Sequence, residues 1–148
     1  MGDMDNVITV FKERQRHKRL EFERRILIEI SLKDLSDNIT EMFSPFFSDA
    51  ILYKGDVENV CMDIAIEAYL LGAEYSKFSC NGESMEAVHR RCFKLEKALI
   101  DALFDYWLFW KTSVGYEESL HLTCDVFVSN WWKAGCEKGI MRRRLRLQ

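Results

Sequence analysis

The sequence predicts an all-α fold, a single-domain helical bundle of about five helices spanning residues 1–148. Pro45 is the only proline in the chain and glycine is sparse, so few positions interrupt a helix. Apolar residues recur at intervals of three and four rather than two, which is the spacing of a buried helix face. Hydrophobic residues make up 48% of the chain and charged residues 30%, a composition typical of a globular domain and too apolar for intrinsic disorder.

The first helix is predicted over residues 7–30. Residues 12–19 contain no apolar side chain, so only the second half of this helix can pack, through Phe22, Ile26 and Ile30. We therefore expect a polar, solvent-exposed start over 12–19.

A second, short helix is predicted to end at Phe43. Ser31 followed three residues later by Asp34 resembles a capping box, which would begin this helix, and Ser44-Pro45 would end it. The connection after Pro45 is the only long loop that the pattern predicts.

The third helix is predicted over 56–81, between Asp56 as its N-terminal cap and the Asn81-Gly82 turn. Its apolar residues fall on one face: Val57, Val60, Cys61, Ile64, Ala68, Leu71 and Tyr75.

The fourth helix is predicted as one continuous element over 84–111, roughly 40 Å long and central to the bundle. Between residues 98 and 110 its only charged side chains are Asp101 and Asp105. A helix that is apolar nearly all round is covered on several sides, at the centre of a bundle or at a subunit interface. We favour the bundle centre. The stripe expected to pack is Met85, Val88, Cys92, Leu95, Leu99, Leu103, Tyr106 and Trp110.

The fifth helix is predicted over 117–141, with Leu120, Cys124, Phe127, Trp131 and Gly135 on one face. Gly72 and Gly135 each interrupt a predicted helix, at a cost of about 1 kcal/mol. We interpret both as places where two helices cross closely; a ligand against bare backbone is the alternative.

Positive charge is concentrated near the two ends of the chain. Residues 12–25 hold seven Lys or Arg against three Glu, and 133–148 hold six against one, whereas 26–132 hold eight against eighteen acidic residues. The basic segments, including a basic C-terminal tail at 142–148, could bind an anionic partner. We favour the alternative that they lie against the acidic body or are simply solvated. The candidate anion- or partner-binding residues are Arg14, Arg16, Lys18, Arg19, Arg142, Arg143, Arg144 and Arg146.

Two Glu-x-x-His-x-x-Cys stripes resemble the metal-binding pairs of di-iron helical bundles. They are Glu86, His89, Cys92 and Glu118, His121, Cys124. Each stripe lies in the first turns of its helix, so antiparallel neighbours would separate the two. We therefore favour packing and capping roles over a metal-binding bundle, and over a nucleophilic cysteine, and predict no cofactor.

A second enzyme hypothesis places Mg²⁺ between two carboxylate pairs, as in helical nucleotide phosphohydrolases. Asp63 and Glu67 form one pair, and Asp101 and Asp105 the other. Helical phase turns the second pair away from the predicted apolar stripe, so we favour solvated or salt-bridged side chains.

The five cysteines never form a Cys-x-x-Cys motif and are odd in number, which predicts reduced, buried thiols in the cytoplasm. Neither a signal peptide, a myristoylation motif nor an apolar run long enough to cross a membrane is expected. The four tryptophans are interpreted as core side chains rather than the lining of a ligand pocket.

Three segments carry a family resemblance: EAYLLGAEYSKF at 67–78, DALFDYWLFW at 101–110 and NWWKAGCEKGIMRRRLRL at 130–147. They resemble a small, uncharacterised protein family of Bacillus-type bacteria, a domain of unknown function. The resemblance spans most of the chain, implies a cytoplasmic bacterial protein, and carries over no catalytic residue.

The sequence favours a non-enzymatic interaction or regulatory protein. Its expected partner is another protein or a second copy of itself, with nucleic acid less favoured because the net charge is −3. A Mg²⁺-dependent nucleotide phosphohydrolase and a metal-binding bundle remain the alternatives.

Overall fold

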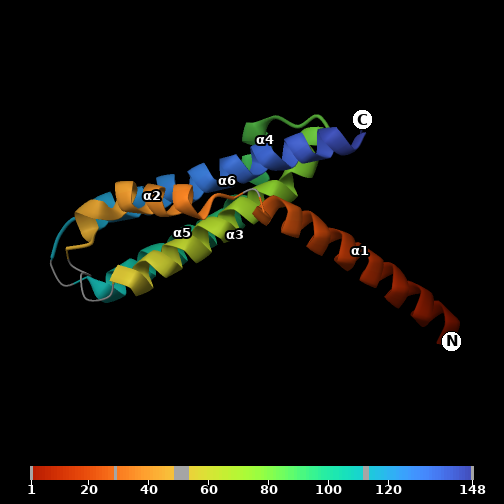
Figure 1. The fold of residues 1–148 in the computed structure, drawn as a ribbon, viewed down its shortest axis with the longest axis horizontal. Helices are drawn as coiled ribbons and strands as arrows, with labels where there is room; N and C mark the ends of the chain where they lie inside the picture. Colours follow the sequence, from red (N-terminus) through yellow and green to blue (C-terminus); the bar gives the residue numbers. More distant parts are fainter. Residues whose placement is uncertain (1, 29, 49–53, 112–113, 148) are drawn as a thin grey trace.

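The computed structural model describes the backbone of residues 2–28, 30–48, 54–111 and 114–147. Across these residues it contains six α-helices and no strand, which confirms the all-α prediction. α2, α3, α5 and α6 run along a common long axis, while α1 diverges from them, and both chain ends lie at the same end of the molecule (Figure 1). The helices are α1 (Gly2–Ile28), α2 (Leu32–Phe43), α3 (Lys54–Cys80), α4 (Met85–Arg91), α5 (Phe93–Trp110) and α6 (Glu117–Leu147), with a 3-10 helix, η1 (Ser44–Phe46), after α2.

α3 and α6 form the most extensive helix pair, and their backbones touch at glycines. A Cβ atom on Gly72 would lie 2.0 Å from the carbonyl oxygen of Trp132, and one on Gly135 would lie 1.9 Å from that of Tyr69. Only glycine allows so close an approach. The predicted close crossing is confirmed, and the ligand alternative fails because another helix fills the space.

Aromatic side chains from three helices form the centre of the core. The ring of Phe43 on α2 stacks on Trp107 of α5 at 5.2 Å and meets Phe127 of α6 edge-on at 5.1 Å. Trp132 is fully buried, and the other two tryptophans are partly buried against the same core. This confirms the interpretation of the tryptophans as core side chains.

The predicted fourth helix is two helices, because the chain leaves the helical path at Cys92. Cys92 has φ −90° and ψ −1°, and its backbone N–H is shared between the carbonyl oxygens of Val88 and His89. Beyond this break the buried face is rotated, so that Glu96 is 5% exposed whereas Leu95 is 50% exposed. Leu95 is therefore wrongly placed in the predicted stripe, whose other members are buried or packed against the core. The predicted central position of this helix is also wrong. The central element is α3, which packs against all five other α-helices.

α5 is covered on one side only. Ile100, Leu103 and Trp107 are buried, but Leu95 and Phe109 are exposed, the latter by 76%. The expectation that the bundle covers this helix on all sides is therefore wrong. A subunit interface on the exposed side of α5 stays a prediction.

Both ends of the chain follow the sequence pattern in part. The Ser31 hydroxyl accepts a hydrogen bond from the backbone N–H of Asp34, which confirms the predicted start of α2. Phe22 and Ile26 of α1 are buried, whereas the described side chains of residues 12–18 are exposed, as predicted. α6 extends to Leu147, so the predicted C-terminal tail forms the last turns of a helix.

None of the described helices has the length and apolar character that a bilayer span requires.

Candidate functional site

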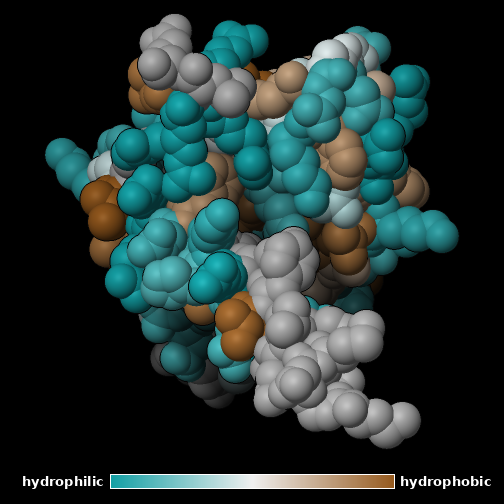
Figure 2. Space-filling view, turned by 90° about the vertical axis from the view of Figure 1, so that its right-hand side faces the viewer, coloured by the Kyte–Doolittle hydropathy of each residue, from teal (hydrophilic) through white to brown (hydrophobic). Residues whose placement is uncertain are grey.

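Two arginines of α6, Arg143 and Arg146, contact Phe22, which lies within the basic segment of α1. The guanidinium of Arg143 lies 4.5 Å from the centre of the Phe22 ring, and that of Arg146 lies 5.8 Å from it. Lys18 and Arg14 precede Phe22 by four and eight residues, so they continue the same side of α1 outward. We call the exposed cations Arg14, Arg16, Lys18, Arg144 and Arg146 the basic surface. Seen from the end where both termini lie, the molecule is mainly hydrophilic with scattered apolar side chains (Figure 2).

Arg143 differs from the other predicted basic residues because the fold already holds it. Its Nε donates to the Ser76 hydroxyl at 2.8 Å, and one Nη donates to the carbonyl oxygens of Ala73 and Glu74 at 3.4 and 3.3 Å. Burial, and then the neighbouring Arg146, lowers the pKa of its guanidinium. Arg143 therefore ties α6 to α3 and contacts Phe22, rather than being exposed like Arg144 and Arg146.

The described acidic side chains form no ion pair with the basic surface. Among the described side chains, Arg14, Arg16, Lys18, Arg144 and Arg146 form no ion pair. Arg142 is half-buried, and the side chain of Arg19 lies outside the described residues. Positive charge is therefore exposed at the end of the molecule that carries both termini.

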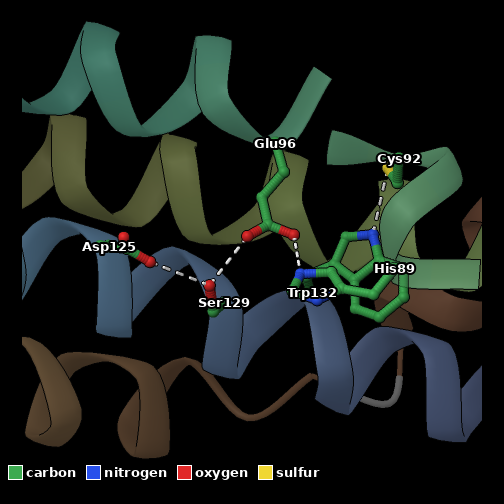
Figure 3. Close-up of polar contacts among 6 residues, drawn as sticks. All are labelled: His89, Cys92, Glu96, Asp125, Ser129 and Trp132. Atoms are coloured by element: carbon green, nitrogen blue, oxygen red, sulfur yellow. Dashed lines mark hydrogen bonds and ion pairs between the residues drawn. The ribbon is translucent and has the colours of Figure 1, made fainter. Parts of the chain in front are cut away.

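A second polar cluster lies between α5 and α6, around the carboxylate of Glu96 (Figure 3). The Ser129 hydroxyl donates to Glu96 Oε1 at 2.8 Å, and His89 Nε2 contacts Glu96 Oε2. Ser129 also lies 3.3 Å from Asp125 Oδ1. The cluster borders a cavity of about 250 Å³ that His121 and Asp101 also line.

This arrangement does not form a nucleophilic relay. In a serine hydrolase the imidazole stands between the hydroxyl and the carboxylate, because it must take the hydroxyl proton. Here the carboxylate of Glu96 stands between Ser129 and His89. The hydrogen bonds instead satisfy a buried charged group, which is otherwise costly.

The thiols of Cys61, Cys92 and Cys124 are not activated as nucleophiles. Burial raises the pKa of Cys92 to about 11 and the pKa of Cys61 and Cys124 to about 12. Cys92 Sγ accepts a hydrogen bond from Trp132 Nε1 at 3.2 Å (Figure 3). All five thiols are free, and four are buried as predicted, but Cys80 is exposed, contrary to the prediction.

The histidines of the two predicted metal-binding stripes contact different residues. His89 contacts Glu96, whereas His121 lies 4.0 Å from Asp101 and meets the Phe104 ring edge-on. Within the described ranges, no three His, Cys, Asp or Glu side chains are grouped so that they could hold a metal ion. Cys92 and Cys124 are buried, and Glu86 and Glu118 are exposed.

The predicted carboxylate quartet is not assembled either. Asp63, Glu67 and Asp105 are exposed, and Asp101 accepts a hydrogen bond from Lys97 at 3.0 Å. These are the solvated and salt-bridged side chains that the sequence favoured.

Comparison with known proteins gives a family. A family model described as "Protein of unknown function (DUF2521)" matches residues 4–148. The chain belongs to this family. It is similar to the uncharacterized protein YbaK of Bacillus subtilis (strain 168), with 28% identity over 141 residues that cover 93% of this chain and 96% of the relative. No solved structure matches. DUF2521 membership confirms the predicted resemblance and assigns no role to any residue.

Sequence reasoning on this DUF2521 protein missed the Glu96 cluster. Cys92, Glu96, Ile100, Leu103 and Trp107 also have helical spacing, and all five are buried. A charged residue within such a stripe was the available signal.

Proposed function

We propose that this protein is a non-enzymatic interaction protein that binds an acidic surface of another protein through its basic surface. The observation that carries the proposal is the packing of Arg143 and Arg146 on Phe22, which joins two distant basic segments. Cations without an acidic partner raise the local potential and attract an oppositely charged surface.

Exposed apolar side chains on α1 and α6 favour a protein partner over nucleic acid. Leu20, Met141 and Leu145 are 52%, 56% and 63% exposed on the same two helices. Protein interfaces combine apolar contact with charge, whereas most nucleic-acid contacts go to phosphates. The acidic remainder of the chain would also repel a long polyanion, and the net charge is −3.

The acidic partner is a different protein or a second copy of this chain, whose exposed Asp63 and Glu67 offer the complementary charge. A cytoplasmic location belongs to the proposal, and the five free cysteines support it.

A matched pair of charge-reversal variants tests the proposal. The binding variant carries Arg14→Glu, Arg16→Glu, Lys18→Glu and Arg144→Glu. The control carries Lys33→Glu, Arg90→Glu, Lys94→Glu and Lys133→Glu, four exposed cations outside the basic surface. Both changes alter the net charge equally.

Each protein is purified from its native cells at low and at high salt, with and without nuclease, and co-purifying molecules are identified. We expect an acidic protein that binds the wild type and the control, is released by salt, and is lost from the binding variant. Equal loss from both variants, or capture that nuclease abolishes, would overturn the proposal.

A further inference from the structure

Three cations converge on one cavity where the end of α3 meets the end of α6. The cavity has a volume of about 270 Å³. Its described lining includes no carboxylate and consists of Lys77, Cys80, Asn81, Arg143 and Arg146.

Arg143 presents a fixed donor to this cavity. Its Nε and Nη2 are held by Ser76 and by two backbone carbonyls of α3, and Phe22 covers one face of the guanidinium. Nη1 makes no hydrogen bond within the described part of the chain. A guanidinium fixed in this way loses little conformational freedom when it binds an anion.

Lys77 and Arg146 complete the cavity as exposed charges. Each lies over an aromatic ring, Phe78 at 5.3 Å and Phe22 at 5.8 Å, and neither forms an ion pair among the described side chains. Like charges gathered in a small volume repel one another. A bound anion would relieve this repulsion.

We propose that this pocket binds the phosphate group of a small phosphorylated molecule. Phosphate carries about two negative charges and several acceptor oxygens, which suit Nη1 of Arg143, the guanidinium of Arg146 and the point charge of Lys77. A single carboxylate would leave most of the positive charge unmatched. The volume lies near the lower end of small-molecule sites, about 300 Å³, so the pocket holds a phosphate or pyrophosphate moiety rather than a large ligand. This site does not depend on the proposed protein partner.

Titration calorimetry of the full chain with pyrophosphate, inorganic phosphate and acetate at constant ionic strength tests the pocket. We expect saturable one-to-one binding of pyrophosphate, weaker binding of phosphate and none of acetate. Lys77→Ala and Arg146→Ala should each weaken pyrophosphate binding about tenfold, the loss of one charge-assisted contact.

Both variants change exposed side chains, and circular dichroism verifies that they fold. Lys133→Ala, an exposed cation elsewhere on α6, is the control and should bind as the wild type does. Absence of saturable pyrophosphate binding, or equal binding by all four proteins, would refute the pocket. None of the residues changed in the partner-binding test lines the cavity, so the two proposals fail separately.

Discussion

Replacing Gly135 with alanine tests the contact between α3 and α6 that positions both candidate sites. The new Cβ would lie 1.9 Å from the carbonyl oxygen of Tyr69, about 1.5 Å closer than ordinary contact. A backbone carbonyl inside a helix cannot turn away, so the two helices must separate along their largest interface.

Overpacking costs about 1–3 kcal/mol and occasionally more, and we expect about 3 kcal/mol here because backbone must move. Alanine regains about 1 kcal/mol of helix propensity. The net loss is about 2 kcal/mol, which corresponds to a Tm lower by about 4–8 °C for a chain of this size.

Urea unfolding followed by far-UV circular dichroism, together with a thermal scan, measures the loss. Gly55→Ala is the control, because a Cβ at Gly55 meets nothing within 4 Å. We expect Gly55→Ala to be neutral or stabilising. A Gly135→Ala protein as stable as the wild type would show that the helices do not cross as described.

Three further predictions concern single side chains. Glu96→Ala removes the buried carboxylate that both Ser129 and His89 contact, while Ser129 keeps Asp125 as an acceptor, and should lower the free energy of unfolding by about 1–3 kcal/mol in urea titrations; an unchanged midpoint would contradict the buried network. In native protein at pH 8, a thiol reagent should modify only Cys80 rapidly, because burial keeps the pKa of Cys61 and Cys124 near 12 and their thiolate fraction small. Fast labelling that persists in Cys80→Ser would disprove that assignment. Arg143→Ala removes the contacts to Ser76 and Phe22, so hydrogen exchange should speed up in residues 20–28 more than in Arg144→Ala; equal exchange in both variants would count against the role of Arg143.

Local signals in the sequence predicted the helices well. Ser31 with Asp34 predicted the start of α2, and the two glycines predicted where α3 and α6 cross. These signals depend only on neighbouring residues or on the absence of a side chain.

The break at Cys92 carried no such signal, because neither glycine nor proline is present there. It rotates the following helix, which is why Glu96 rather than Leu95 is buried. Tertiary contacts such as the hydrogen bond from Trp132 to Cys92 accompany the break, and a local pattern does not reveal them.

The charge distribution identified the basic residues but not their arrangement. Phe22 and Arg143 are more than a hundred residues apart in the sequence, and the spacing of residues does not reveal that they are in contact. Nor could spacing distinguish Arg143, which is hydrogen-bonded to α3, from the exposed Arg144, because that distinction depends on Ser76 of α3.

The central claim is that basic residues of α1 and α6 act as one surface for an acidic protein. Photo-crosslinking in native cells tests it directly, with a photoreactive residue at exposed Leu20 of α1 and, as a control, at exposed Leu108 of α5. We expect an adduct with an acidic protein from Leu20 only, and loss of that adduct when Arg144→Glu is introduced on α6. Adducts that form equally from Leu108, or that survive Arg144→Glu undiminished, would contradict it.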